Sequence, residues 1–263
     1  MLNHPTFEKL RTLRLNGMLQ ALQEQTQRHD RSDEIYQQIE ALSFEERLGL
    51  LVDREVTERE NRRLQTRLRK ANLRQQASIE DIDFQAARGL DRALVMRLSS
   101  CQWVEARHNV LITGPTGVGK SYLGCALAHK ACLKGYSAFY RRLPRLLEQL
   151  HLAKADGSYG KMLLRLSKID VLVLDDWGLV KLNPALQHDL LEVIDDRHDR
   201  RSTIVTSQLA VEHWHETMTD PTLADAILDR LIHTAYRLNL RGESMRKKRA
   251  ELLESEYLFR CTL

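Results

Sequence analysis

Two patterns of apolar and polar positions divide the chain. Between residues 5 and 76 the apolar side chains recur at helical spacing, as in the pair Leu10 and Leu13, and few glycines or prolines interrupt the pattern. A Ser-x-x-Glu sequence at residues 43–46 is typical of a helix start, because the Ser oxygen and the Glu side chain each satisfy a free backbone N–H. The first part of the chain is therefore predicted to be helical.

After about residue 78 the pattern changes to short β-rich runs that alternate with helical stretches. Strands are predicted at residues 109–113, 137–140, 169–174, 203–206 and 236–240. Segments long enough for crossover helices separate these runs, so the alternation predicts a parallel sheet with helices on both faces. We therefore predict an α/β fold, with a helical N-terminal domain at residues 1–78 and a second domain at residues 79–263.

Composition excludes several classes of protein. Of the 263 residues 43% are hydrophobic and 29% are charged, which is enough apolar material for a packed core. No apolar run approaches the ~20 residues of a membrane span. The four cysteines lie far apart without a CxxC pair, which argues against a disulfide scaffold and a structural zinc site. We expect a soluble, cytoplasmic protein.

The distribution of charge is more informative than the net charge of +4. No acid occurs between Asn61 and Ile79, and the cations of this stretch recur at spacings of four and seven: Arg62, Arg63, Arg67, Arg69, Lys70 and Arg74. One interpretation is a solvated helix face. The other is a surface that binds the phosphates of double-stranded DNA, because Lys and Arg near a duplex release condensed counterions. The missing acids favour DNA binding.

A phosphate-binding loop follows the first predicted strand. The sequence Gly114, Pro115, Thr116, Gly117, Val118, Gly119, Lys120 and Ser121 matches G-x-x-x-x-G-K-[ST] in full, between a strand and a predicted helix. Its glycines let backbone N–H groups point at phosphate oxygens, and the helix N-terminus adds partial positive charge. Lys120 is expected to reach the β and γ phosphates, and Ser121 is expected to ligate Mg²⁺.

A second acidic motif follows the third predicted strand. The apolar run 169–174 ends in Asp175 and Asp176. At this position the first carboxylate is expected to hold Mg²⁺, usually through water. Asp176 is then placed to orient or deprotonate the attacking water. The fourth predicted strand delivers Ser207 and Gln208 at its end, and Gln208 is our first choice as a residue that senses the γ phosphate, with Ser207 as the alternative.

Two arginines near the end of the chain are candidates for phosphate contacts. A guanidinium is always charged and its fork fits phosphate oxygens, so Arg230 and Arg246 could each stabilise phosphoryl transfer. From the residues alone, a surface salt bridge is the simpler explanation of either one.

Taken in order, the P-loop, the sequence LVLDDWG at 172–178, STIVTSQ at 202–208, LDRL at 228–231 and GESMR at 242–246 resemble the IstB-type ATPases. These are transposition helper proteins of bacterial insertion sequences, related to replicative helicase loaders within the AAA+ superfamily. The resemblance covers about residues 1–250. It implies an AAA+ core with five parallel strands that binds ATP with Mg²⁺.

The resemblance also implies a function and two residue roles. It implies ATP-dependent oligomerisation on duplex DNA, with ATP at the subunit interfaces, and delivery of the transposase of the same element. Arg230 is then similar to an arginine finger inserted into a neighbour's site, and Arg246 to a second sensor that contacts ATP in its own subunit. Asp176 stands where many AAA+ proteins have Glu, and Gln208 where Asn is common, so hydrolysis is expected to be slow until a partner arrives.

Two alternatives share the P-loop. A replicative helicase loader would use the same core, and the gene beside this one, transposase or helicase, would separate the two. A P-loop kinase for a small metabolite would need a lid over the nucleotide. Only residues 247–263 follow Arg246, which is short for the helical C-terminal lid of many AAA+ proteins.

Overall fold

The computed structural model describes residues 5–26, 39, 41–245 and 247. The chain divides into two compact units, Met1–Thr66 and Arg67–Leu263. By packing, residues 67–78 group with the second unit, whereas the domain boundary predicted from the sequence follows residue 78. The domain boundary after residue 78 stays a prediction.

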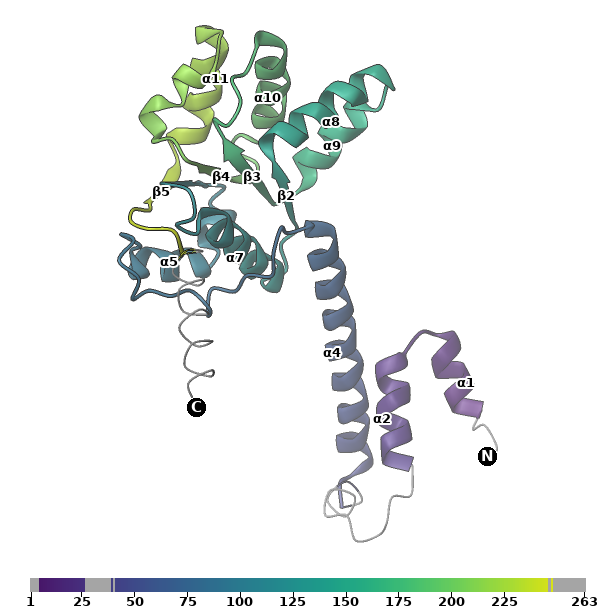
Figure 1. Cartoon of the computed structure of the whole chain (residues 1–263). Coiled ribbons are helices and arrows are strands. Elements are labelled where there is room, and N and C mark those ends of the chain that lie inside the picture. Colours follow the sequence, from purple (N-terminus) through teal and green to yellow (C-terminus); the bar gives the residue numbers. More distant parts are fainter. Residues whose placement is uncertain (1–4, 27–38, 40, 246, 248–263) are drawn as a thin grey trace, which may run out of the picture. The chain divides into compact units, whose positions relative to one another are not determined.

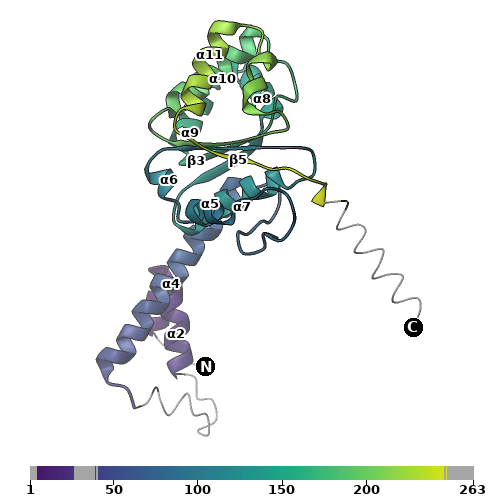
Figure 2. The same cartoon turned by 90° about the vertical axis from the view of Figure 1, so that its left-hand side faces the viewer.

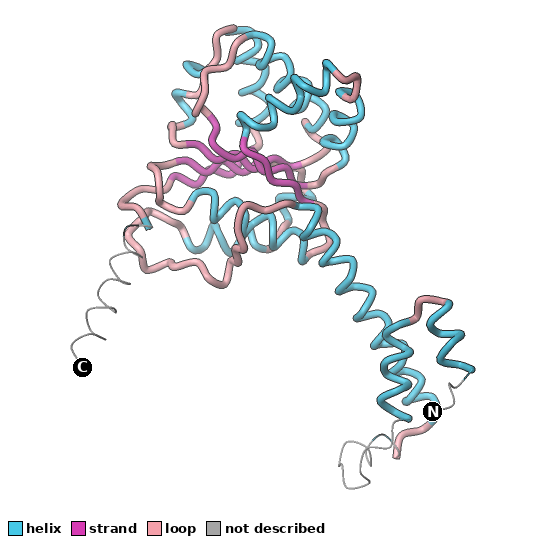
Figure 3. Tube along the Cα trace, turned by 45° about the vertical axis from the view of Figure 1, so that its right-hand side comes forward, coloured by secondary structure: helices cyan, strands magenta, loops and turns pink. Residues whose placement is uncertain are grey.

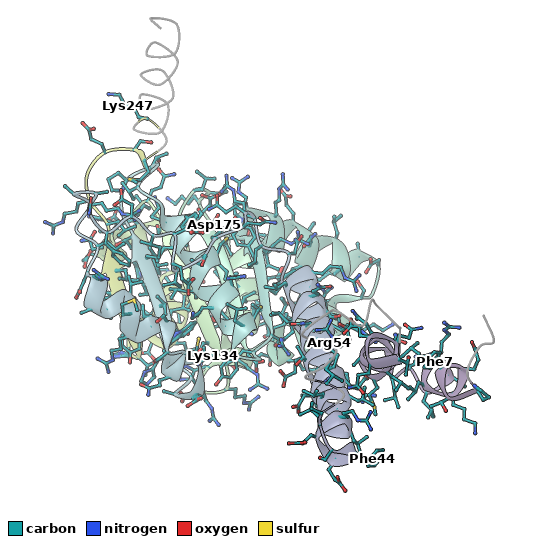
Figure 4. All side chains as sticks on the ribbon, turned by 90° about the horizontal axis from the view of Figure 1, so that it is seen from below. Phe7, Phe44, Arg54, Lys134, Asp175 and Lys247 are labelled. Carbon is teal, nitrogen blue, oxygen red and sulfur yellow. The ribbon has the colours of Figure 1, made fainter. Side chains whose placement is uncertain are left out.

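The first unit is helical. It contains α1 (Pro5–Thr12), α2 (Asn16–Thr26) and most of α4 (Phe44–Ala71). The predicted capping box at the start of α4 is confirmed, because the Ser43 N–H donates to Glu46 Oε2 over 2.8 Å and the Glu46 N–H donates to Ser43 Oγ over 3.2 Å. In Figure 4 the label on Phe44 marks this end of the helix.

One buried carboxylate joins α2 to α4. Glu55 on α4 accepts the backbone N–H groups of Gly17 and Met18 over 2.7 and 3.2 Å. These N–H groups belong to the first turn of α2, where no intrahelical acceptor exists. A Cβ at Gly17 would lie 2.7 Å from the Arg54 carbonyl oxygen, so a side chain there would separate the two helices. Arg54 is labelled beside this contact in Figure 4.

The second unit is built on five parallel strands in the order β2, β3, β4, β1, β5. Their bounds are β1 Asn109–Thr113, β2 Ala138–Arg142, β3 Val171–Trp177, β4 Ser202–Ser207 and β5 Ala235–Asn239. Each predicted strand overlaps one of these. The central strands are rich in Val, Ile and Leu, and residues 171–174 are fully buried, as expected where both faces of a sheet are covered.

Helices cover both faces of this sheet, as Figures 1 and 2 show. One face carries α5 (Arg92–Ser99) and α7 (Lys120–Leu133), and the other carries α8 (Leu143–Ala155), α9 (Tyr159–Lys168), α10 (Pro184–Arg197) and α11 (Pro221–Ile232). The short α6 (Gln102–Glu105) precedes β1, and two 3-10 turns, Val211–His213 and His215–Thr217, precede α11. Figure 3 shows the strands enclosed between these layers. The predicted α/β fold is confirmed.

No helix among the described residues combines the length and the apolar character needed to cross a membrane.

Candidate nucleotide site

The carboxyl ends of the strands meet at one edge of the sheet. In the parallel register Arg142 of β2 faces Asp175 of β3, and Thr113 of β1 faces Ser207 of β4. Ligands of open α/β sheets bind at this edge, where the loops that follow each strand converge. Ser121 of the P-loop and Asp175 of the acidic motif, which are 54 positions apart in the sequence, are therefore brought together.

The P-loop has the backbone conformation that its glycines permit. Gly114 has φ +142°, and a Cβ there would lie 2.2 Å from the Leu240 carbonyl oxygen, so this position accepts glycine only. Gly119 lies in the left-handed region at φ +101° and caps α7, which begins at Lys120. The Lys120 side chain is nearly buried, and its Nζ donates to the Pro115 carbonyl over 2.6 Å. The ammonium group therefore lies folded within the loop.

A buried arginine that the sequence analysis missed supports the P-loop from outside. Arg88 donates from Nη1 to the Val118 carbonyl over 3.1 Å and from Nη2 to the Asp83 carbonyl over 2.7 Å. A Cβ at Gly119 would lie 2.8 Å from Arg88 Nη1, so the glycine also makes room for this guanidinium. Burial lowers the pKa of Arg88 from its usual value. No sequence motif marks this residue, because its contacts depend on tertiary packing.

Asp175 is fully buried and surrounded by donors. Ser121 Oγ lies 2.9 and 3.2 Å from its two carboxylate oxygens, and the Tyr140 hydroxyl donates to Oδ2 over 2.5 Å. The Thr206 hydroxyl also donates to this carboxylate, and Arg74 Nη1 lies 3.3 Å from Oδ2. Burial and the neighbouring Asp175 both raise the pKa of Tyr140, which keeps its hydroxyl protonated and able to donate.

The pairing of Ser121 with Asp175 fits a Mg²⁺ site. A hydroxyl and a carboxylate within hydrogen-bond distance, at the N-terminus of the helix that follows the P-loop, supply the oxygen ligands that Mg²⁺ prefers. A buried carboxylate also needs compensating positive charge. In this structure Arg74 supplies part of that charge.

Asp176 is engaged in an ion pair at the same edge of the sheet. Its backbone lies in the left-handed region at φ +52°, and Arg142 Nε donates to its Oδ2 over 2.5 Å. The exposed fractions of the two side chains are 21% and 37%, so solvent reaches this ion pair. A carboxylate engaged in this way has to leave Arg142 before it can accept a proton from water.

The two candidates at the end of β4 differ in environment. Ser207 is buried, and its hydroxyl donates to the Trp177 carbonyl over 2.9 Å and accepts the Leu209 N–H over 3.1 Å. Gln208 is exposed. The residue of β4 that contacts Asp175 is Thr206, which the sequence analysis did not select. Gln208 lies one residue beyond the end of β4.

Arg230 lies at the opposite edge of the sheet. It belongs to the last turn of α11, and its carbonyl accepts Asn109 Nδ2, from the first residue of β1, over 3.2 Å. β1 has five residues, so the two edges are roughly 15 Å apart at about 3.3 Å per residue. Arg230 Nε forms an ion pair with Asp195 over 2.6 Å, and its side chain is 30% exposed.

The segment after β5 returns to the P-loop. The Met245 N–H donates to the Gly117 carbonyl over 3.0 Å, and the Leu240 N–H donates to the Thr113 carbonyl over 2.8 Å. Arg246, the predicted second sensor, lies outside the described residues. Met245, the residue before it, is hydrogen-bonded to the P-loop.

The cations of the predicted DNA-binding stretch separate into two groups. Arg67 Nε donates to the Cys132 carbonyl over 3.1 Å, and Arg74 contacts Asp175, so both side chains are directed into the second unit. The other four are exposed and lie one heptad apart in pairs on α4: Arg62, Arg63, Arg69 and Lys70.

Comparison with known proteins agrees with this geometry. The model of the family described as "IstB-like ATP binding protein" matches residues 8–252. The chain belongs to this family. A protein described as an insertion-sequence ATP-binding protein, y4pL of Sinorhizobium fredii, is 51% identical to it over 247 residues, which are 94% of this chain and 98% of the relative. This IstB-like chain is therefore a member of an ATP-binding family of insertion sequences.

Solved structures show the same fold. The crystal structure of DnaI matches with a TM-score of 0.55 and 23% identity, over 63% of this chain and 91% of DnaI. That of the DnaC helicase loader matches with a TM-score of 0.51 and 21% identity, over 65% of this chain and 96% of the loader. The second unit of this IstB-like protein therefore has an AAA+ P-loop fold.

Proposed function

We propose that this IstB-like protein is an ATPase that oligomerises on duplex DNA when it binds ATP and recruits the transposase of its insertion sequence to the target. The observation that carries the proposal is the buried Asp175 carboxylate, 2.9 Å from Ser121 at the end of the P-loop. This pair and the loop give one subunit the parts needed to bind ATP with Mg²⁺. The insertion-sequence relatives support a transposase as the partner.

The proposed reaction is hydrolysis of ATP to ADP and phosphate. The P-loop N–H groups and Lys120 hold the phosphates, and Ser121 and Asp175 hold Mg²⁺, which neutralises phosphate charge when it is bound. Asp176 accepts a proton from water as the water oxygen bonds to the γ phosphorus and the bond to the bridging oxygen breaks. Because Arg142 holds Asp176 in this structure, hydrolysis needs a rearrangement of that pair.

The position of Arg230 supports assembly. An arginine at the far edge of the sheet lies too far from its own P-loop to contact phosphates there, which supports a role in the site of a neighbouring subunit. A guanidinium supplied in this way stabilises the charge of phosphoryl transfer. ATP would then lie between subunits and stabilise the oligomer, and hydrolysis would release it. Arg246 is proposed as the second sensor within the subunit.

Double-stranded DNA is the proposed template for assembly. The exposed cations of α4 at residues 62, 63, 69 and 70 supply positive charge, and no acid occurs between Asn61 and Ile79, although Arg62 forms an ion pair with Glu58 over 3.0 Å. Replacing all four by Ala should weaken binding to a duplex and reduce the slope of log K against log salt by up to about 3.6, at about 0.9 per phosphate contact. An unchanged slope would show that this helix face is only solvated.

The mass of the protein with duplex DNA tests the whole proposal. Light scattering at one salt concentration would compare ATP, ADP and no nucleotide. A large complex that forms only with ATP and DNA together is the expected result. A monomer under all three conditions, which still binds ATP, would contradict the assembly. The helicase-loader alternative would then be tested by adding a ring helicase to the protein and ATP.

A further inference from the structure

The segment that follows α4 runs back along α7 toward the P-loop. Arg67 contacts the carbonyl of Cys132 near the end of α7, whereas Ser78 contacts the hydroxyl of Tyr122 near its start, with the Ser78 N–H and carbonyl each 3.3 Å from that oxygen. The chain reverses at Asn72, whose φ of +49° is typical of the residue that ends a helix. Arg74 lies between these two contacts, on the same segment.

A groove of about 860 Å³ opens beside this segment. Its lining combines the apolar Leu68, Leu73 and Ala77 with polar and basic side chains, which are Arg69, Asn72, Arg74, Gln75, Gln76, Ser78 and His129. Asp81 is the single acid among the described residues that line it. Its two arginines, the amide side chains and one hydroxyl are suited to the backbone phosphates of DNA, which accept hydrogen bonds and carry negative charge. Arg69 also belongs to the exposed basic face of α4.

Arg74 contacts both the groove and the nucleotide site. Its side chain is 43% exposed in the groove, although the Asp175 carboxylate that it contacts is fully buried. The distance of 3.3 Å exceeds the 2.7–2.9 Å that is usual for a hydrogen bond between charged groups, so the contact is loose. Asp175 already accepts bonds from the Ser121, Tyr140 and Thr206 hydroxyls. If Arg74 moves away from Asp175, the carboxylate therefore still accepts hydrogen bonds from three hydroxyls.

We propose that Arg74 exchanges partners between Asp175 and a phosphate of duplex DNA, and that this exchange couples DNA binding to the binding of ATP with Mg²⁺. The inference rests on the proposed function, and it adds the residue through which the binding of DNA and the binding of ATP with Mg²⁺ influence each other. A Mg²⁺ ion held by Ser121 and Asp175 would repel the guanidinium of Arg74. The guanidinium then turns into the groove, where DNA supplies a new anion.

The coupling must act equally in both directions. If bound nucleotide raises the affinity for DNA by some factor, bound DNA raises the affinity for nucleotide by the same factor. In the absence of DNA, Arg74 competes with Mg²⁺ for Asp175. Replacing Arg74 by Ala should therefore reduce the Mg²⁺ concentration needed for half-maximal nucleotide binding. The expected reduction is about threefold, because the pair of Arg74 and Asp175 is partly exposed.

The experiment compares Arg74→Ala with Arg69→Ala, which removes a groove cation that does not contact Asp175. Anisotropy of a fluorescent duplex measures DNA affinity with and without Mg²⁺ and a non-hydrolysable ATP analogue, and a fluorescent nucleotide gives the reverse measurement. Arg74→Ala should reduce the coupling factor at least about threefold in both directions and shift the Mg²⁺ titration downward. Arg69→Ala should weaken DNA binding yet retain the coupling factor and the Mg²⁺ midpoint.

Other results would overturn the exchange. A coupling factor that Arg74→Ala leaves unchanged, or an equal loss of coupling in Arg69→Ala, would show that Arg74 adds only general positive charge. A higher Mg²⁺ midpoint in Arg74→Ala would mean that Arg74 supports nucleotide binding instead. Wild-type coupling that persists in Arg74→Ala would overturn the exchange alone. A wild-type protein that binds both ligands without coupling, or that binds no duplex or no ATP, would overturn the proposed function as well. Arg74→Lys, which keeps the charge, should retain part of the coupling.

Discussion

The two edges of the sheet use their charged residues in opposite ways. At the carboxyl edge, three hydroxyls and the Arg74 guanidinium converge on one buried carboxylate, Asp175, beside the P-loop. At the amino edge, Arg230 and Arg197 dominate, but only one of them is enclosed. Arg197 is 1% exposed, whereas the Arg230 side chain is 30% exposed beside an exposed acid. Under the proposed assembly, one subunit would carry two halves of a site, which would meet only between neighbouring copies.

Loss of Arg230 should have the largest effect. In Arg230→Ala, kcat for ATP hydrolysis should fall roughly 10³-fold or more, because the charge of the transition state loses its partner from the neighbour. ATP binding by the monomer should remain, since Arg230 lies far from its own P-loop. Nucleotide binding and phosphate release measure the two quantities. Arg200→Ala, an exposed arginine near the same edge, is the matched control and should retain activity.

Mixing two inactive variants tests the same comparison more sharply. Arg230→Ala has an intact nucleotide site, and Asp176→Asn has an intact Arg230. Mixed oligomers would therefore contain interfaces with both halves, and activity should partly return. If no mixing ratio restores hydrolysis, the role of Arg230 in a neighbour's site is excluded.

The second effect in size concerns the carboxyl edge. Asp176→Asn should lower kcat about 10²-fold or more, because Asn cannot accept the proton of the attacking water. ATP affinity should be retained, and the complex with DNA should persist longer. Asp199→Asn is a closely matched control, since Asp199 also has φ +52° but is exposed at the amino edge. Equal losses in both variants would indicate a backbone effect rather than proton transfer.

How much of this site could be predicted from the sequence depends on how local each contact is. The P-loop and Asp175 follow strands in the sequence, so their position was predictable from the alternation of strands and helices. Thr206, Tyr140 and Arg88 were not predicted, because strand register and long-range packing bring them to the site. Arg74 was assigned to DNA from its neighbours in sequence, and its contact with Asp175 spans 101 positions.

The enclosed arginine of the amino edge should control stability instead of hydrolysis. Arg197 donates to the carbonyls of Leu166, Ile169 and Ser202 over 2.6, 2.7 and 2.5 Å, and so joins the end of α9 to β4. Burial lowers its pKa to about 9, so it remains charged at neutral pH. Arg197→Met should lower the free energy of unfolding by about 3–5 kcal/mol, because these carbonyls lose their donors.

Urea denaturation measures this loss, with Arg200→Met as the control for removing an exposed arginine near the same edge. The control should change the free energy of unfolding by less than about 0.5 kcal/mol. If Arg197→Met were as stable as the control, the enclosed guanidinium would have no structural role, and the contrast between the two arginines would be lost.

The smallest expected effect is a gain of activity at the carboxyl edge. Arg142→Ala removes the cation that holds Asp176 over 2.5 Å, so the carboxylate becomes free to approach water. Because the pair is partly exposed and worth about 0.2–1 kcal/mol, basal kcat should rise only about 1.4- to fivefold. Arg145→Ala, an exposed arginine on the following turn, should leave kcat unchanged. A decrease in Arg142→Ala would instead assign Arg142 a direct part in catalysis, and Asp176 would then require its ion pair in order to function.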